Sequence, residues 1–390
     1  MKKYNLLFLF LSILLCACEG KGKLDPDPTP DPKPYVIPDP NPPSVYKYGL
    51  RELARANNLL LGAAFTYNEY AGDDSLEVVL KRDFEAVTFG NEMKHDCIVN
   101  SSGICNFFTA DTMVGWAKEC GSQLFGHTLG WHSQQQTDYL NALISGAADA
   151  DAAAAAVRAA YADFVDRMVQ HFDTYAWDVV NEVFAEDGNW RTGSVTPANY
   201  HVFLWGDYYK GGTKEFVDTA FRTAREALAK YGKKADLYIN DYNLEWNPAK
   251  LEALCSYAEK NPDVTGVSSQ MHCNTDLGEA AIKNMLERMV RTGKKVRISE
   301  LDVPQGSIPT NTQADVIVSI FKIYLDTVPE KQRGGITFWG VSDKNSWLGK
   351  GKNPLLYDTL YKRKDSYRAL HAFLLERAGG EEALHLNGEN

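Results

Sequence analysis

The sequence predicts an α/β protein with the fold of a (β/α)8 TIM barrel, built as a single domain. Short apolar segments alternate with longer amphipathic segments about eight times along the chain, which is typical of parallel βα units. Nearly every apolar segment ends in amides, imidazoles, carboxylates or indoles, as expected where the strands of a barrel end. A chain of 390 residues also suits one barrel domain.

Short apolar runs bounded by turn residues are expected to form the strands of this barrel. Their lengths suit strands rather than helices. The expected strands are Leu60–Phe65, Ala86–Gly90, Gln123–Leu129, Ala176–Asn181, Ala235–Asn240, Gly266–Gln270, Lys295–Ser299 and Gly335–Phe338.

Helices are expected between the strands, where apolar residues recur at helical spacing. Val157, Tyr161 and Phe164, for example, fall on one helix face. A doubly wound sheet would alternate in the same way, but no glycine-rich phosphate loop follows the first strand and no Walker pattern occurs. The expected helices are Val157–Phe172, Phe216–Tyr231, Ala249–Lys260, Gly278–Thr292 and Thr312–Thr327.

The formal net charge of -10 argues against nucleic acid as a partner, because nucleic-acid affinity comes largely from cationic contacts to phosphate. The charge fits a neutral ligand, or simply a soluble surface. Aromatic residues make up 12% of the chain, which suits stacking on sugar rings and equally suits a large core. Composition therefore excludes one class of partner without choosing among the others.

The N-terminus has the pattern of an export signal. Two lysines at positions 2 and 3 precede Leu6–Leu15, an apolar run too short to span a membrane as a mature helix. The run ends in Leu15-Cys16-Ala17-Cys18, which looks like a bacterial lipobox. We therefore expect residues 1–18 to be a lipoprotein signal peptide and Cys18 to carry the lipid. The protein would then be exported and anchored to a bacterial membrane, most simply the outer membrane, on either its periplasmic or its cell-surface side. A plain secretory peptide is the alternative.

Residues 19–44 are expected to form a linker. Nine of the sixteen prolines lie in this segment, and such a density of proline favours extended polyproline. At ~3.1 Å per residue the segment would reach on the order of 80 Å. We expect the catalytic domain at 45–378 and a polar C-terminal tail at 379–390.

Five cysteines follow Cys18, and an odd number cannot pair completely. Export makes a disulfide possible, and Cys97 and Cys105 are the nearest pair in sequence. No CxxC pair occurs among the five, so no structural zinc site is expected. HExxH is absent as well, and we expect neither a metal nor an organic cofactor. The five are Cys97, Cys105, Cys120, Cys255 and Cys273.

Two glutamates stand out, because Glu182 and Glu300 each follow an apolar strand that should be buried. Burying a carboxylate is costly unless it is paired or used. Cleavage of a glycosidic bond needs two carboxyls, one protonated to donate to the leaving oxygen and one ionised to attack the anomeric carbon. Environments that push the two pKa values apart make this division possible. Two structural ion pairs are the alternative interpretation.

The motifs resemble those of glycoside hydrolase family 10, the endo-β-1,4-xylanases, over nearly all of the chain after the linker. WDVVNEVF at Trp177–Phe184 resembles the family's acid/base segment, and RISELDV at Arg297–Val303 resembles its nucleophile segment. Order, spacing and strand context match across six segments. The resemblance implies a retaining endo-1,4-β-xylanase that acts as a monomer on xylan and xylo-oligosaccharides by double displacement.

The resemblance also implies the roles of the central residues. Glu182 would be the acid/base and Glu300 the nucleophile, while Asn181 would hold the 2-hydroxyl of the sugar being cleaved. His272 would bond to Glu300, with Asp302 behind it. Strand alternation agrees, because Glu300 and Asp302 point to the same face. An ionised partner would give His272 a fixed tautomer.

Further residues are expected to position the substrate. Trp339 and Trp347 surround a polar loop, which favours a cleft roof where indole faces stack on sugars rather than a place in the core. Tyr242 and Gln270 are expected to line the floor of the cleft. The full set implied by the resemblance is Asn91, Lys94, His127, Trp131, Gln134, Tyr242, Gln270, Trp339 and Trp347.

Two departures from the family pattern affect the outer part of the cleft. The family usually has Glu where this chain has Gly90, and it often has Arg where this chain has Leu348. Loss of a hydrogen bond to a charged group is worth about 1.5–3 kcal/mol, so binding two sugars from the cut should be weaker or altered. Glu92 should point to the other face of a regular strand and is not expected to substitute.

Three other functions remain alternatives. A barrel hydrolase acting on β-glucan or an aryl xyloside would share the chemistry, and a catalytically silent lipoprotein that binds glycans would share the aromatic cleft. A metal hydrolase would lose activity to chelators. A retaining mechanism predicts the two carboxyl groups about 5–5.5 Å apart.

Overall fold

The computed structural model describes residues 46–193, 201–308, 310–381 and 384. All of these residues belong to one compact unit, which spans 37–390. The expected signal peptide (1–18), the lipid attachment site at Cys18, the linker (19–44) and most of the tail (379–390) lie outside the described residues.

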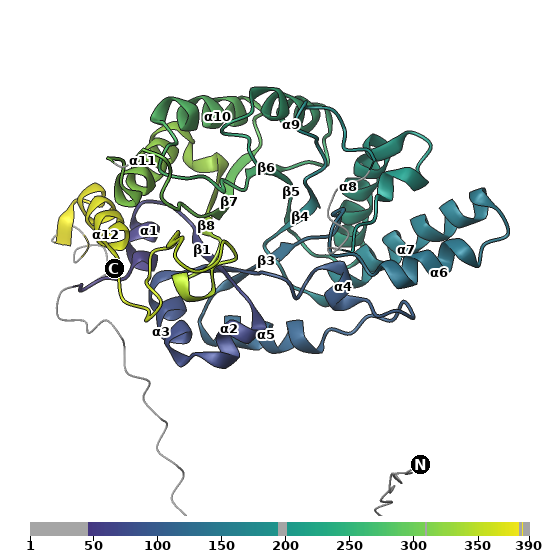
Figure 1. Ribbon diagram of the computed structural model, residues 1–390, viewed down its shortest axis with the longest axis horizontal. Helices are drawn as coiled ribbons and strands as arrows, with labels where there is room; N and C mark the ends of the chain where they lie inside the picture. The colour runs from purple at the N-terminus through teal and green to yellow at the C-terminus, as the bar shows by residue number, and fades with distance from the viewer. Residues whose placement is uncertain (1–45, 194–200, 309, 382–383, 385–390) are drawn as a thin grey trace, which may run out of the picture. The chain divides into compact units, whose positions relative to one another are not determined.

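Eight parallel strands close into a barrel, in which each strand pairs with its neighbours in sequence (Figure 1). The last strand pairs with the first, so that Ala63 lies opposite Phe338 and the ring has no free edge. The expected fold class is confirmed, and every expected strand is present with its ends moved by two residues at most. The strands are β1 (Leu61–Phe65), β2 (Ala86–Phe89), β3 (Gln123–His127), β4 (Ala176–Asn181), β5 (Asp236–Asp241), β6 (Gly266–Ser269), β7 (Lys295–Leu301) and β8 (Arg333–Phe338).

Helices surround the barrel, as Figure 1 shows. The five expected helices are confirmed as α7 to α11, and the others were not individually expected. Within the described ranges, no helix has both the length and the apolar content needed to cross a bilayer. The helices are α1 (Leu50–Ala56), α2 (Tyr67–Gly72), α3 (Asp74–Asp83), α4 (His95–Ile98), α5 (Phe108–Glu119), α6 (Thr137–Ser145), α7 (Ala150–His171), α8 (Gly212–Lys230), α9 (Pro248–Lys260), α10 (Glu279–Arg291), α11 (Gln313–Thr327) and α12 (Asp365–Arg377), with 3-10 turns η2 (Trp205–Tyr208), η3 (Glu330–Gln332) and η4 (Asp343–Asn345).

Helix α7 begins seven residues before the expected start at Val157. Asp149 caps it by accepting a hydrogen bond from the Ala152 amide at 2.8 Å. The intervening turns are rich in alanine, which favours helix without producing an apolar stripe. Hydrophobic spacing therefore located only the part of the helix that packs on the barrel.

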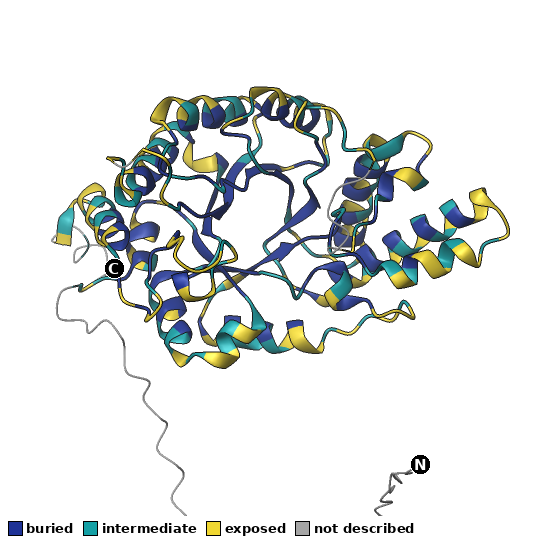
Figure 2. Ribbon diagram, viewed as in Figure 1, coloured by how far each residue is buried: buried dark blue, intermediate teal, exposed yellow. Residues whose placement is uncertain are grey.

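The core has two layers, and Figure 2 shows the strands buried between them. The outer layer lies between strands and helices, where α7 contributes Val157, Tyr161 and Phe164. Inside the barrel, Phe125 and Tyr238 pack together with the guanidinium of Arg297 over the Phe125 ring at 3.8 Å. These side chains come from the first parts of their strands and fill that end of the ring. The carboxyl ends of the strands are thereby left to form a site.

Gly126 allows the wall of the barrel to close around Trp177, which is fully buried. The two residues lie opposite each other in the β3–β4 register. A Cβ atom at position 126 would lie 2.1 Å from Cε3 of the Trp177 ring, far inside van der Waals contact. A close approach of indole to backbone therefore requires glycine here.

None of the five cysteines that follow Cys18 is in a disulfide. Cys97 is exposed and Cys105 partly exposed, and both are free thiols although they are nearest in sequence. No disulfide therefore contributes to the stability of the described part of the fold.

We predict that Gly126→Ala destabilises the protein by about 1–3 kcal/mol, because the new methyl group overpacks a rigid core. Chemical denaturation measures the free energy of unfolding. Gly115→Ala is the matched control, since a Cβ there meets no atom within 4 Å in helix α5. It should leave stability unchanged or raise it by up to about 1 kcal/mol. Equal effects of the two substitutions would contradict the prediction.

Candidate active site

The carboxyl ends of the strands open into a cleft of about 720 Å³, a size typical of ligand sites. All of the residues expected at the site line this cleft, except for Asp302, which was expected to lie behind His272. The expected residues found in the lining are Asn91, Lys94, His127, Trp131, Gln134, Asn181, Glu182, Tyr242, Gln270, His272, Glu300, Trp339 and Trp347.

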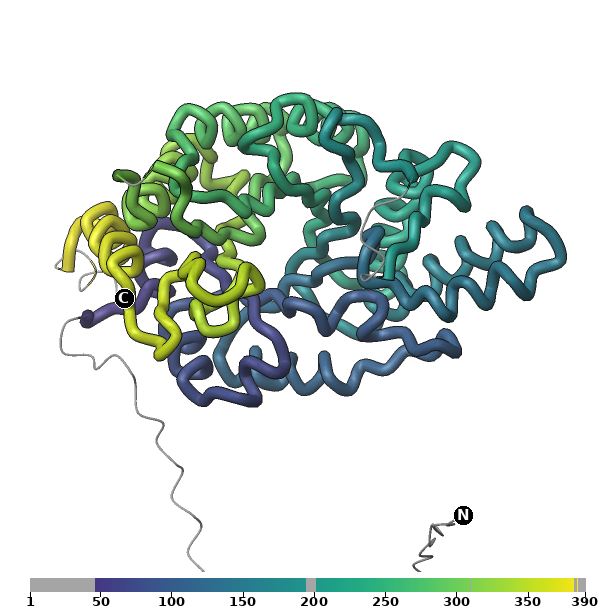
Figure 3. Tube along the Cα trace, in the orientation of Figure 1, coloured from purple at the N-terminus to yellow at the C-terminus, as the bar shows by residue number. Residues whose placement is uncertain are grey.

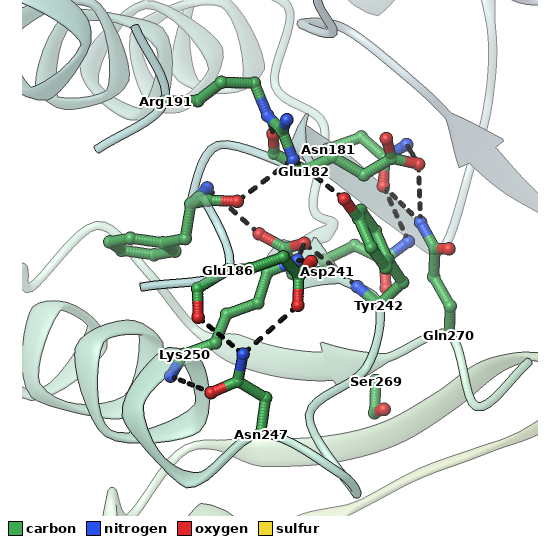
Figure 4. Close-up of polar contacts among 12 residues, drawn as sticks. Asn181, Glu182, Glu186, Arg191, Asp241, Tyr242, Asn247, Lys250, Ser269 and Gln270 are labelled. Atoms are coloured by element: carbon green, nitrogen blue, oxygen red, sulfur yellow. Dashed lines mark hydrogen bonds and ion pairs between the residues drawn. The ribbon is translucent and has the colours of Figure 1, made fainter. Parts of the chain in front are cut away.

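Glu182 follows β4 and Glu300 lies within β7, and a chain of amide groups joins their carboxyls. The Gln270 amide donates to Glu182 at 3.0 Å and to the Asn181 carbonyl oxygen at 3.1 Å. The Asn240 amide donates to the same Asn181 oxygen at 3.0 Å and to Glu300 at 2.9 Å. Figure 4 shows the Glu182 end of this chain. The two carboxyl groups are therefore linked through two amide donors that share one acceptor, the side-chain oxygen of Asn181.

Burial alone would raise the pKa of Glu182, yet its pKa lies below the ordinary value. The nearby His132 imidazole, the Gln270 amide and the Arg191 guanidinium outweigh the burial. The raised pKa expected of a proton donor is therefore absent in the open cleft. The electrostatic interactions with His132 and Arg191, together with the hydrogen bond from Gln270, favour the charged form of this carboxyl.

His272 bridges the carboxylates of Glu300 and Asp302. Its Nε2 lies 3.3 Å from Glu300 and its Nδ1 lies 2.9 Å from Asp302. Burial lowers the pKa of the imidazole, but the two carboxylates raise it more, to about 10. A ring with such a pKa carries protons on both nitrogens at neutral pH, so the expected single tautomer gives way to an imidazolium.

The backbone of Glu182 adopts a left-handed conformation, with φ at 58°. This region is unfavourable for a side-chain-bearing residue and needs support from its surroundings. Arg191 supplies part of that support by donating from Nε to the Glu182 carbonyl oxygen at 2.7 Å. Its Nη2 donates to the Phe184 carbonyl and to the Tyr242 hydroxyl, both at 3.1 Å. Arg191 thus clamps the turn that carries Glu182 (Figure 4).

A fully buried ion pair lies beneath the same turn. Lys250 contacts Asp241 at 2.8 Å, and neither side chain is exposed. Asp241 also accepts a hydrogen bond from the Phe184 amide at 3.1 Å, two residues after Glu182. The Lys250 ammonium lies 3.4 Å from the centroid of the Tyr242 ring and reaches Glu186 at 3.1 Å. Figure 4 shows this group, which fixes both the Glu182 turn and Tyr242.

The wall formed after β2 and β3 carries the only lysine among the described residues that line the cleft. Lys94 donates to the Gln134 side-chain oxygen at 2.7 Å and lies 4.9 Å from the Trp131 ring centroid. Gln134 in turn donates to Asn91 at 3.2 Å. Burial lowers the pKa of Lys94, while Glu300 and Glu182 oppose that shift. From the sequence, Lys94 could also have been a solvated lysine without a role in the site. Its buried position argues against that alternative.

Trp339 and Trp347 bring aromatic surface to the cleft. Trp339 meets the His127 ring edge-on, with ring centroids 5.4 Å apart. Trp347 is 60% exposed, so its face is available to a ligand rather than buried in the core. Its indole nitrogen donates to Asp302 at 2.7 Å, which links the exposed ring to the pair behind Glu300.

Only one of the two departures from the family pattern lies in the lining of the cleft. Gly90 lines the cleft with backbone only, whereas Leu348 does not line it. Glu92 turns away, because its carboxylate accepts hydrogen bonds from the amides of Tyr67 at 2.8 Å and Asn91 at 3.1 Å. The expectation that Glu92 does not replace the missing side chain is therefore confirmed.

Sequence reasoning missed several residues of the site, among them Asn240, His132, Arg191 and Glu69. Asn240 carried a signal, since a buried amide at a strand end beside other polar residues has no structural need to be there. His132 and Arg191 carried none, because they lie in loops without periodicity. Glu69 lies in a short helix after β1 and also lines the cleft. Among the described residues, no group of three or more His, Cys, Asp or Glu is arranged to hold a metal.

Comparison with known proteins agrees with this geometry. The profile of glycosyl hydrolase family 10 matches residues 49–373. The endo-β-1,4-xylanase Xyn10C of Cellvibrio japonicus is 33% identical over 82% of this chain, which spans only 56% of that relative. Endo-1,4-beta-xylanase 3 of Hypocrea jecorina is 33% identical over 76% of this chain and 77% of its own. The crystal structure of xylanase 10B from Thermotoga maritima superposes with a TM-score of 0.70 at 30% identity, covering 85% of this chain and 99% of its own.

We predict that Lys250→Met destabilises the protein by about 3–5 kcal/mol, because it leaves the Asp241 carboxylate buried without its partner. Lys344→Met is the matched control, since it removes a partner of Asp73 from an ion pair whose lysine is 43% exposed. An exposed pair of this kind is worth about 0–1 kcal/mol. Urea denaturation of the two variants measures the difference, and similar losses would show that the Lys250 pair adds no special stability.

Proposed function

The chain belongs to glycosyl hydrolase family 10, and on that basis we propose that it is a retaining endo-1,4-β-xylanase, which hydrolyses internal β-1,4-xylosidic bonds of xylan. The observation that carries the proposal is the amide chain that turns the carboxyls of Glu182 and Glu300 toward one cleft. Glycoside cleavage by double displacement needs two such groups on opposite sides of the scissile bond.

In the first step, the ionised Glu300 attacks the anomeric carbon of the xylose on one side of the bond. Glu182 gives its proton to the leaving oxygen as the C–O bond breaks, so the departing chain leaves as a neutral alcohol. In the second step, Glu182 takes a proton from water, and the water oxygen displaces Glu300 from the same carbon. Two inversions give net retention of the β configuration.

Glu182 must gain a proton before the first step, although its pKa in the open cleft is lowered. A bound sugar chain removes water from the carboxyl, which disfavours the ionised form and raises the pKa. The glycosidic oxygen of the substrate only accepts hydrogen bonds. Beside Glu182, it therefore favours the protonated form of this carboxyl, which can donate. Substrate binding itself thus prepares the acid.

The neighbouring side chains divide into orienting and binding groups. His272, held by Asp302, keeps the Glu300 carboxylate in place by a hydrogen bond. Asn181 is positioned for the 2-hydroxyl of the sugar being cleaved, while Lys94, Asn91 and Gln134 form a polar wall for the hydroxyls beside it.

Two related crystal structures with bound xylo-oligosaccharides support xylan as the substrate. A related crystal structure, xylanase 10B from Thermotoga petrophila, is a complex with xylobiose at 30% identity and a TM-score of 0.71. A mutant of xylanase 10C from Cellvibrio japonicus is in complex with xylopentaose at 29% identity and a TM-score of 0.71. Because the catalytic residues all come from one chain, we expect a monomer to be active.

We predict that Glu182→Ala and Glu300→Gln lose activity in different ways. Glu182→Ala should lower kcat/KM on xylan by about 10²- to 10⁴-fold, the usual contribution of a general acid. The loss should be far smaller on an aryl xylobioside with an activated leaving group, and azide should restore turnover by replacing water in the second step. Glu300→Gln should lose activity on both substrates without recovery in azide.

The exposed Glu119→Gln is the control for these variants and should match the wild-type protein. Proton NMR of the first product should show the β anomer. Wild-type protein that binds xylan but releases no reducing ends would identify a glycan-binding protein instead. Faster hydrolysis of cellulose oligomers than of xylo-oligosaccharides would identify a β-glucanase.

We further propose that the protein is exported and anchored to a bacterial membrane through a lipid on Cys18. The support is the paired lysines, the short apolar run and the Leu15-Cys16-Ala17-Cys18 motif. Two signals or a double acyl chain are needed for a stable anchor, and bacterial lipoproteins satisfy this at one cysteine. In cells fed labelled palmitate, the wild-type protein should take up label and sediment with membranes, and Cys18→Ala should do neither. Labelling of the variant would refute this anchor.

A further inference from the structure

Three carboxyl groups line the described part of the cleft, and the proposed reaction uses only two of them. The third belongs to Glu69, in the first turn of helix α2 directly after β1. Its carboxylate accepts a hydrogen bond from the Thr66 amide at 2.6 Å, which fixes the side chain before any ligand arrives. Figure 3 shows this purple segment beside the yellow-green segment that follows β8.

The wall next to Glu69 has no side chain of its own. A Cβ atom at Gly90 would lie 2.9 Å from the Thr66 methyl group, so Thr66 fills the place where such a side chain would begin. The nearest carboxylate after strand β2, Glu92, accepts hydrogen bonds from the backbone amides of Tyr67 and Asn91 and does not line the cleft. Glu69 is therefore the acidic group that this end of the cleft presents to a ligand.

The order of strands in the barrel tells which half of the substrate meets Glu69, given the proposed function. Glu182 follows β4 and protonates the leaving oxygen, so the departing half of the chain extends over β4 and β5. In a closed ring of eight strands, β1 and β8 lie opposite β5 and β4. Glu69 follows β1, and it therefore faces the half of the chain that stays bound to Glu300.

The turn after β8 completes this end of the cleft. Lys344 in η4 contacts Asp73, the residue that ends helix α2, at 2.6 Å. This ion pair ties the loop with Asn345 and Trp347 to the helix with Glu69. Asn345 and Trp347 both line the cleft, so an exposed aromatic face and a carboxylate lie on one stretch of its rim.

We propose that Glu69 binds hydroxyl groups of the retained half of the substrate, two or more sugars from the cut, and discriminates by charge against a uronic acid substituent there. A carboxylate accepts hydrogen bonds from neutral xylose hydroxyls, and it repels a second carboxylate brought into the same partly buried space. Burial raises the pKa of Glu69, and the negative charge of the nearby Glu92 adds to that shift. Lys344 is already paired with Asp73 and does not offset it.

The position of the Glu69 contact can be tested with aryl glycosides that differ in the number of xylose units on the retained side. Glu69→Ala should lower kcat/KM on an aryl xylotrioside by on the order of 10- to 100-fold, mainly through KM, the equivalent of one lost hydrogen bond to a charged group. The same variant should match the wild-type protein on an aryl xyloside, whose single sugar does not reach Glu69. An equal loss on both substrates, or none on either, would overturn the proposal.

Glu69→Gln removes the negative charge of the side chain but keeps its shape. The variant also keeps an acceptor for the Thr66 amide, so the fold of helix α2 should be preserved. This variant should cleave glucuronic-acid-substituted xylan about tenfold better relative to arabinose-substituted xylan than the wild-type protein does. Glu77→Gln on the neighbouring helix α3 is the matched control and should leave that ratio unchanged. A ratio in Glu69→Gln equal to that of the wild-type protein refutes the charge effect.

The xylanase activity and the role of Glu69 can be tested independently of each other. If the wild-type protein cleaves no xylan, the proposed function is wrong. If it cleaves xylan and the Glu69 variants behave as the wild-type protein on every substrate, only the role of Glu69 is wrong. Isothermal titration of xylotetraose into Glu300→Gln, with and without Glu69→Ala, measures the same contact without turnover and should show a comparable loss of affinity.

Discussion

The site depends on holding two carboxyl groups in the lining of one cleft. Left to themselves, Glu182 and Glu300 would repel each other and would each lose hydration. The amide chain of Gln270, Asn181 and Asn240 resolves this by giving both groups fixed donors, and His272 adds a positive charge on the far side of Glu300. The closed barrel makes the arrangement possible, because it brings the ends of β4, β5, β6 and β7 together although they are distant in sequence.

The unfavourable backbone conformation of Glu182 is stabilised by residues that lie outside the cleft lining. Its left-handed backbone is stable only because Arg191 holds the carbonyl oxygen and Asp241 holds the amide two residues later. Asp241 in turn needs Lys250, since a lone carboxylate at that depth would be neutral. The position of Glu182 thus depends on the Lys250–Asp241 ion pair, which does not line the cleft. This dependence explains why both charges are buried beneath the turn.

The sequence was sufficient for the barrel and for nearly all of the cleft. Strands β1 to β8 are short apolar runs between turn residues, and their ends carry the polar groups that line the site, so Glu182, Glu300 and Gln270 could be placed by position alone. Arg191 and Glu69 could not, because each lies in a loop or short helix whose path depends on contacts with distant segments. The protonation of His272 and the lowered pKa of Glu182 also escaped prediction, since both follow from distances of a few ångströms among residues that only the closed fold brings together.

The hydrogen bond from the Trp347 indole to Asp302 has a consequence for how the enzyme tolerates change. An aromatic ring on a solvent-facing loop would normally sample several rotamers, and a ligand would have to freeze them. Here the hydrogen bond from Trp347 to Asp302 already holds the indole in one rotamer. A change at the neighbouring Leu348, which does not line the cleft, therefore leaves this anchor of the indole in place.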